Sequence, residues 1–153
     1  MPPDASASIR RRGARFDPFA AGWWWGPLLA RQPAVLALVV DDEEPIRRLV
    51  GRLLRREGYA VNEAADGDEA IRKIGDSPPQ LIVLDLMMPR VNGFDVIRHI
   101  QSTNPALLKH TLVVSAYPRE AAAQRLHEIC DVISKPFDIA TFTAAVSRCA
   151  SAA

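Results

Sequence analysis

The sequence predicts an α/β domain built on a doubly wound parallel sheet, and two observations carry this prediction. Short runs of branched apolar residues, such as 35–40 and 81–84, alternate five times with helical patterns. Runs of this length and composition indicate strands that are buried on both faces. Two of these runs also end abruptly in acid: Asp41 and Asp42 follow the first, and Asp85 follows the second.

The first strand, residues 35–40, leads through its acidic end into a helix. Pro45 suits the first helical turn, where its missing N–H has no partner to lose. Gly58 marks the end of this helix. Between them, a stripe at helical spacing predicts the buried face: Ile46, Leu49, Val50, Leu53 and Leu54.

Residues 59–64 are the second predicted strand. Asp66, with Glu69 three residues later, has the pattern of a capping box that opens the second helix. After the third strand at 81–84, a loop ending at Gly93 leads into a third helix. Its predicted inward residues are Phe94, Ile97 and Ile100.

Residues 112–115 and 132–134 are the fourth and fifth predicted strands. An alanine-rich helix over residues 119–128 separates them. A final helix carries one apolar face: Ile139, Phe142, Val146 and Cys149. Five βα units without a long insert predict helices on both faces of one sheet.

The carboxyl ends of these strands gather the residues that can carry chemistry, and in open α/β sheets this edge holds the binding site. If the first and third strands are neighbours, Asp41, Asp42 and Asp85 converge. Two unit charges ~5 Å apart at an effective dielectric of ~20 repel by roughly 3 kcal/mol. Such a cluster requires a cation, and an all-oxygen site suits Mg²⁺. Ser115 and Lys135 bring a hydroxyl and an ammonium to the same edge.

Four short motifs at the strand ends resemble the receiver domain of bacterial two-component response regulators. In chain order they are Asp41-Asp42, residues 85–89 (Asp-Leu-Met-Met-Pro) with Gly93, Ser115-Ala116, and Lys135-Pro136-Phe137. The resemblance covers about residues 34–150. It implies a flavodoxin-like sheet with strand order 2-1-3-4-5, which places the first strand beside the third.

The resemblance also assigns roles to the acidic residues. Asp85 is the expected phosphoacceptor, and its donor is phosphohistidine on a sensor histidine kinase or a histidine phosphotransfer protein. Asp41, Asp42 and Asp85 are expected to hold Mg²⁺, together with the backbone carbonyl of Met87. Of the first two, Asp42 is the expected direct ligand.

Lys135 is expected to pair with the phosphoryl oxygens, and its peptide bond to Pro136 is cis in relatives. Ser115 is expected to donate its hydroxyl to the phosphoryl group. Two departures from the family concern its usual output face. Val132 stands where relatives carry Tyr or Phe, and the interval from Ser115 to Lys135 is about two residues short. Neither departure touches the phosphorylation chemistry.

Five arginines line the predicted outer face of the first helix: Arg47, Arg48, Arg52, Arg55 and Arg56. Two explanations remain open. A solvated helix face accounts for the charges without a partner. In the family this helix helps to dock the histidine-containing partner, so the arginines could instead steer an acidic partner surface.

The totals indicate one ordinary globular domain: the chain has 153 residues, of which 48% are hydrophobic and 24% charged. No apolar run reaches the ~20 residues that a membrane span requires. Residues 34–153 carry 14 basic and 16 acidic side chains, a net charge of −2 that does not indicate nucleic-acid binding. We therefore expect a cytoplasmic protein with no membrane span and no direct DNA binding.

We expect residues 34–150 to form the receiver domain and residues 1–33 to be an extension that precedes it. Pro, Ala, Ser, Gly and Arg dominate it without a period of 2 or 3.6 residues, so we expect disorder. A wrongly chosen upstream translation start and a docking arm that contains Trp23, Trp24 and Trp25 are the alternatives. An export signal is excluded, because its hydrophobic core would be the first strand of the domain.

The chain has two cysteines, Cys130 and Cys149, which lie 19 residues apart. Neither belongs to a CxxC motif, and no histidine stands near them at a metal-ligand spacing. We therefore expect two free thiols, as is usual for a cytosolic protein.

The expected function is that of a stand-alone receiver, which accepts phosphate on Asp85 and is not a turnover enzyme on a separate substrate. After Lys135 we expect one last helix and no DNA-binding output domain, so the signal would reach an unknown protein target through protein contacts. The alternative is a phosphorylation-independent interaction module with the same fold. A haloacid-dehalogenase-like phosphatase is set aside, because it needs a second acid where this chain has Met87.

Overall fold

A computed structural model describes residues 34–119 and 128–152 of the chain. The described residues form a five-stranded sheet in the order β2-β1-β3-β4-β5, with every pair parallel. The strands are β1 (Leu36–Val40), β2 (Ala60–Ala64), β3 (Leu81–Leu84), β4 (Thr111–Ser115) and β5 (Asp131–Ser134). The predicted fold class and strand order are confirmed.

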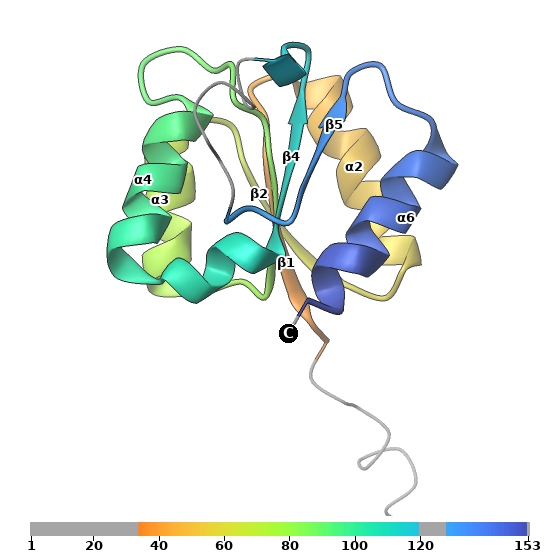
Figure 1. The fold of residues 1–153 in the computed structure, drawn as a ribbon, viewed down its shortest axis with the longest axis horizontal. Helices are drawn as coiled ribbons and strands as arrows, with labels where there is room; N and C mark the ends of the chain where they lie inside the picture. Colours follow the sequence, from red (N-terminus) through yellow and green to blue (C-terminus); the bar gives the residue numbers. More distant parts are fainter. Residues whose placement is uncertain (1–33, 120–127, 153) are drawn as a thin grey trace, which may run out of the picture. The chain divides into compact units, whose positions relative to one another are not determined.

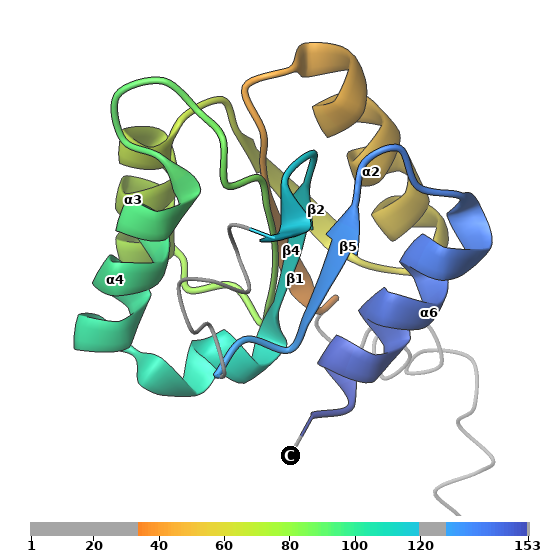
Figure 2. The ribbon, with the colours of Figure 1, turned by 45° about the horizontal axis from the view of Figure 1, so that its top comes forward.

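Helices cover both faces of this sheet (Figures 1 and 2). One face carries α2 (Glu44–Arg56) and α6 (Ile139–Ala150), and the other carries α3 (Gly67–Asp76) and α4 (Gly93–Thr103). A short 3₁₀ helix, η1 (Pro105–His110), leads into β4. The extension predicted at residues 1–33 and most of the helix predicted at 119–128 lie outside the described residues.

The sheet separates two hydrophobic clusters, as the alternation of side chains along a strand requires. Leu38 and Val40 of β1 face the cluster that α3 and α4 complete. Ala37 and Val39 face the cluster that α2 and α6 complete. Phe142 of α6 is fully buried in this second cluster. Burial on both faces explains why β1 reads as a continuous apolar run.

Two residues of the predicted apolar faces were placed wrongly. The buried face of α2 contains Val50, Leu53 and Leu54, whereas Leu49 lies at the margin of the stripe and is 43% exposed. Ile139, the first residue of α6, is 55% exposed. In both cases helical spacing alone does not show how far the covering elements extend.

The helix ends carry the predicted stop and cap residues, but the complete capping box lies at a different helix from the one predicted. Gly58 adopts a positive φ of 94° just after α2, which is the usual helix stop. Asp66 accepts the N–H of Glu69 at the start of α3. The complete capping box, with both reciprocal hydrogen bonds, lies instead at the start of α4, between Asn92 and Asp95.

The prediction of two free thiols is wrong, because Cys130 and Cys149 form a disulfide. Cys130 directly precedes β5, and Cys149 lies in the last turn of α6. A helix that packs on its own strand runs back along it, so its end returns to the start of the strand. The cysteine spacing alone does not reveal this return.

Candidate functional site

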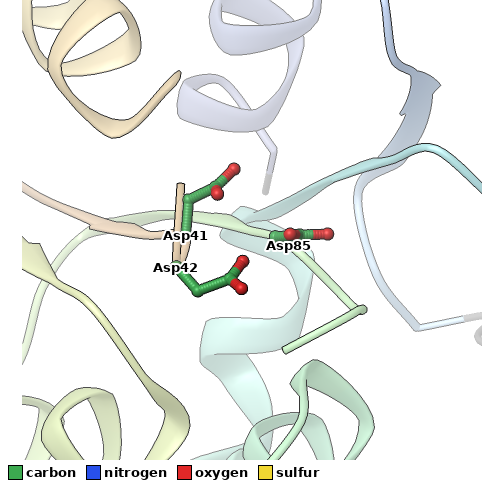
Figure 3. Close-up of side chains that lie close together, drawn as sticks. All are labelled: Asp41, Asp42 and Asp85. Carbon is green, nitrogen blue, oxygen red and sulfur yellow. The ribbon is translucent and has the colours of Figure 1, made fainter. Parts of the chain in front are cut away.

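The three aspartates predicted to converge lie together at the carboxyl end of the sheet. Val40 of β1 pairs with Leu84 of β3, so the residues that follow these two leave neighbouring strands side by side. One oxygen from each of Asp41, Asp42 and Asp85 lies within 4.8 Å of the other two. Figure 3 shows the three side chains on their two chain segments.

The three aspartates of this acidic cluster differ in their exposure to solvent. Asp41 and Asp85 are each only 4% exposed, whereas Asp42 is open to solvent. Burial raises the pKa of Asp85, and the neighbouring charge of Asp41 raises it further. The N–H of Met87, 3.1 Å from Asp85 Oδ1, and the ammonium of Lys135 act in the opposite direction, but the net shift is upward.

Lys135 lies among the carboxylates. Its Nζ is 2.7 Å from Asp41 Oδ2, 3.4 Å from Asp85 Oδ2 and 3.5 Å from Glu43 Oε1. Burial lowers the pKa of Lys135, but the hydrogen bonds and charges of Asp41 and Asp85 more than offset it, so the pKa is raised and the ammonium persists. The peptide bond to Pro136 is cis, as the resemblance implied.

The loop between β1 and α2 is held by Arg47, one of the five arginines predicted to lie on the outer face of the helix. That placement was wrong for this one arginine, whose side chain is only 16% exposed. Its Nη1 donates to the backbone carbonyl of Asp41 at 2.7 Å, and its Nε lies 3.7 Å from Glu63 Oε2. The N–H of Glu43 also donates to Asp41 Oδ1, at 2.8 Å. No motif distinguishes Arg47 from the other arginines of α2.

The loop between β3 and α4 passes very close to the backbone of Asp85. The N–H of Gly93 donates to the carbonyl of Leu86 at 3.0 Å. A Cβ at position 93 would lie 2.4 Å from the backbone oxygen of Asp85 and 2.6 Å from Leu86 Cα. Only glycine fits this approach without a shift of the backbone. Met87, whose carbonyl is a predicted metal ligand, lies in the same loop with its side chain 49% exposed.

Ser115, the predicted hydroxyl donor, is fully buried at the end of β4. Its Oγ accepts the backbone N–H of Tyr117 at 3.1 Å. Its backbone carbonyl accepts the N–H of Lys135 at 2.8 Å, which ties the ends of β4 and β5 together. Of the six predicted site residues, the structure therefore gathers Asp41, Asp42, Asp85 and Lys135 directly and places Ser115 on the adjoining strand end.

The donor set fits Mg²⁺. The cluster offers carboxylate oxygens from Asp41, Asp42 and Asp85, and hard oxygen ligands are those that Mg²⁺ prefers. Three carboxylates and the ammonium of Lys135 leave two negative charges, which a divalent cation would neutralise. Asp42, the exposed member, opens the cluster to solvent, and Mg²⁺ usually keeps several of its waters.

A sequence profile of the response regulator receiver domain matches residues 37–147. The chain belongs to the receiver domain family of response regulators. Among curated relatives of this receiver domain, the transcriptional regulatory protein ResD of Bacillus subtilis is 42% identical over 104 residues, which cover 65% of this chain and 41% of ResD. Response regulator RR06 of Streptococcus pneumoniae is 39% identical over 104 residues, 67% of this chain and 46% of RR06. The chain thus spans less than half the length of these relatives.

Solved structures agree with this assignment. The receiver domain of NtrX from Brucella abortus is 30% identical, with a TM-score of 0.69, and the match covers 76% of this chain and 99% of that one. TrrA from Thermotoga maritima, solved in complex with Mg²⁺ and BeF, is 27% identical with a TM-score of 0.67, covering 74% of this chain and 97% of TrrA. Receiver domains are signalling domains of two-component systems rather than classical enzymes, and the acidic pocket found here is compatible with Mg²⁺ and phosphorylation.

Among the described residues, every helix is too short or too polar to cross a membrane.

Proposed function

We propose that this receiver domain accepts a phosphoryl group on Asp85, with Mg²⁺ held by Asp41, Asp42, Asp85 and the backbone carbonyl of Met87. One observation carries the proposal. Three carboxylates lie within 4.8 Å of one another, and the ammonium of Lys135 lies within hydrogen-bond reach of two of them. An aspartate that only capped a loop at a strand end would need neither two further carboxylates nor a lysine beside it.

The proposed reaction is a transfer from phosphohistidine. A carboxylate oxygen of Asp85 attacks the phosphorus, the bond to the imidazole nitrogen breaks, and an aspartyl phosphate forms. Phosphoryl transfer depends mainly on alignment and on neutralising charge. The bound metal would supply neutralisation, and Lys135, next to Asp85 Oδ2, would pair with a phosphoryl oxygen.

Ser115 is suited to recognise the product. Its Oγ already accepts the N–H of Tyr117, which leaves its own hydrogen available to donate. A phosphoryl oxygen on Asp85 is the acceptor that we propose for it. By the same groups the domain would assist its own phosphorylation and dephosphorylation, without turning over a separate substrate.

We further propose that a sensor histidine kinase or a histidine phosphotransfer protein docks on α2. Leu49 supports this, because it is a large apolar side chain that the fold leaves 43% exposed on this helix. The arginines of α2 that face solvent supply a basic rim: Arg48, Arg52, Arg55 and Arg56. An apolar centre with a charged rim is the usual composition of an interface.

The signal would pass to an unidentified protein target through protein contacts, and not through direct DNA binding by this unit. Residues 34–153 carry 14 basic and 16 acidic side chains, which does not favour contact with phosphates. We place the protein in the cytoplasm, in keeping with the response regulators that it resembles.

Phosphotransfer profiling against a panel of phosphorylated histidine kinases and phosphotransfer proteins tests the proposal. The wild type should take label from one donor well before the others, and the Asp85→Asn variant should take none. Leu49→Glu should slow transfer from that donor but not from acetyl phosphate, because only the protein donor needs the α2 surface. If no donor labels the wild type above Asp85→Asn, the alternative of a phosphorylation-independent interaction module is favoured.

A further inference from the structure

The disulfide lies at the end of β5 that is remote from the aspartates. Cys130 comes one residue before the strand, and Lys135 comes one residue after it. The Cα atoms of Cys130 and Cys149 are 5.4 Å apart, within the usual ~4.4–6.8 Å of a disulfide. β5 is therefore held at both ends, by the sulfur bridge to α6 and by the contacts of Lys135 with Asp41 and Asp85.

We propose that Cys130–Cys149 is a reversible thiol–disulfide site, through which a dithiol reductant sets the mobility of the edge formed by β5 and α6. The two cysteines differ in exposure. Cys149 is fully buried, whereas Cys130 is partly exposed and lines an open hollow of about 740 Å³. The hollow is bordered by Ala106, Lys109, Ile129 and Arg148, among others. A small thiol, or the active-site loop of a dithiol protein, can therefore approach Cys130.

The exchange follows ordinary thiol–disulfide chemistry. A thiolate of the reductant attacks Sγ of Cys130, the S–S bond breaks, and Cys149 leaves as a thiolate that takes up a proton. The second thiol of the reductant then attacks the mixed disulfide and releases Cys130. The dithiol thereby gives two electrons and two protons to the protein and becomes a disulfide itself. An oxidised dithiol reverses the sequence.

After reduction the junction keeps the apolar packing of Val146 and Cys149, which are buried in the cluster that α2 and α6 complete, and a small set of polar contacts among the described residues. Arg148 pairs with Asp131, but that pair is exposed and such pairs contribute little. His110 Nδ1 lies 2.7 Å from the carbonyl of Cys149, and the N–H of Cys130 donates to Thr111 at 3.0 Å. β5 itself is an edge strand that pairs with β4. Reduction should therefore loosen both the strand start and the last turn of α6.

The increased mobility at the start of β5 would reach the acidic site, because β5 is a short strand that ends next to Lys135. β5 has only four residues, and Lys135 follows its last residue directly. A strand that moves at its start positions Lys135 less firmly against Asp41 and Asp85. For this last step the inference rests on the proposed role of Asp85, whereas the redox exchange itself does not.

The experiment compares the oxidised protein with the protein after dithiothreitol, under native conditions. Alkylation followed by intact mass should find no free thiol before reduction and two after it. Backbone hydrogen exchange should then be about tenfold faster at residues 130–134 and 146–150 in the reduced protein. Phosphorylation by acetyl phosphate should also slow on reduction.

Two variants make the result specific. Cys130→Ser should show the exchange rates of the reduced wild type and should not respond to dithiothreitol, and Cys149→Ser should behave in the same way. Two alkylatable thiols in protein treated with a mild oxidant, reduction only after denaturation, or exchange rates unchanged on reduction would each overturn the proposal. A redox response in exchange without phosphorylation in either state would overturn the role of Asp85 and leave the redox site standing.

Discussion

At the scale of single residues, the site balances two buried carboxylates with one buried ammonium. Asp41 and Asp85 have little access to water, and Lys135 contacts both. Lys135 and the N–H of Met87 lower the pKa of Asp85, but burial and the charge of Asp41 raise it by more, so the net shift is upward. The metal-free domain therefore carries a carboxylate whose ionised form opposes folding.

This imbalance predicts how stability changes with pH in the Asp85→Asn variant. Because the pKa of Asp85 is raised in the folded protein, the folded state binds the proton more tightly than the unfolded state does. The contribution of Asp85 to stability is therefore fully present below its unfolded pKa of ~3.9 and is lost as the pH rises through its folded pKa. Without Mg²⁺, the variant should therefore melt at a higher temperature than the wild type at neutral pH, and the gap should close below about pH 4. Thermal melts across this pH range measure the gap. A gap that does not depend on pH would contradict the account.

A second prediction concerns Arg47, which donates a hydrogen bond to the backbone carbonyl of Asp41. Arg47→Ala should weaken Mg²⁺ binding by about tenfold, because residues that orient metal ligands typically contribute that much. Isothermal titration calorimetry measures the affinity directly. The matched control is Arg48→Ala, whose side chain is 66% exposed and pairs with Glu44. Equal affinities in the two variants would show that Arg47 does not position the site.

At the scale of elements, the loops that leave β1 and β3 determine the geometry of the site. The start of α4 is fixed by the capping box of Asn92 and Asp95, and Gly93 allows the helix to approach the Asp85 backbone. Gly93 was identified from the sequence as part of a family motif. The reason for glycine at this position, a backbone oxygen 2.4 Å from any Cβ, requires the structure.

Two glycine-to-alanine changes separate this close approach from ordinary helix propensity. Gly93→Ala should destabilise the domain by about 1–3 kcal/mol, as overpacking against backbone does. It should also lower Mg²⁺ affinity, because the strand end that carries Asp85 must shift. Gly75→Ala, in α3 with no atom within 4 Å of the added Cβ, should stabilise by about 0.5–1 kcal/mol. Chemical denaturation gives both values. Two changes of the same sign would contradict the explanation.

The pattern of βα units made a parallel sheet with one carboxyl edge predictable. The resemblance to receiver domains supplied the strand order that brings Asp41, Asp42 and Asp85 together at this edge. The errors have a common cause. The exposed Leu49, the inward Arg47 and the Cys130–Cys149 bond all depend on how the helices lie against the sheet. Periodicity gives the direction of a side chain around its helix axis, but it does not show how far the neighbouring elements extend to cover that side chain.

At the scale of the whole molecule, residues 34–153 form a compact unit that contains both hydrophobic clusters. Val132, which replaces an aromatic residue of the family, is partly buried and packs against the cluster beneath α3 and α4. The described residues of this unit therefore bury their apolar side chains against one another on both faces of the sheet.

This self-sufficiency predicts that residues 34–153 fold alone. A protein that lacks residues 1–33 should keep the melting temperature of the full chain and its rate of phosphorylation, because all five strands of the sheet and both clusters remain. Differential scanning calorimetry and a phosphorylation time course test this together. A large fall in melting temperature would show that the extension, with its three tryptophans, belongs to the folded structure.

The most direct test of the central claim is the intact mass of the protein after incubation with acetyl phosphate. We predict that the wild type gains the mass of one phosphoryl group when Mg²⁺ is present and gains none when EDTA replaces it. Asp85→Asn should gain none in either condition, although it remains folded. A phosphorylated Asp85→Asn variant, or a wild type that stays unmodified with Mg²⁺, would contradict the assignment of Asp85 as the phosphoacceptor.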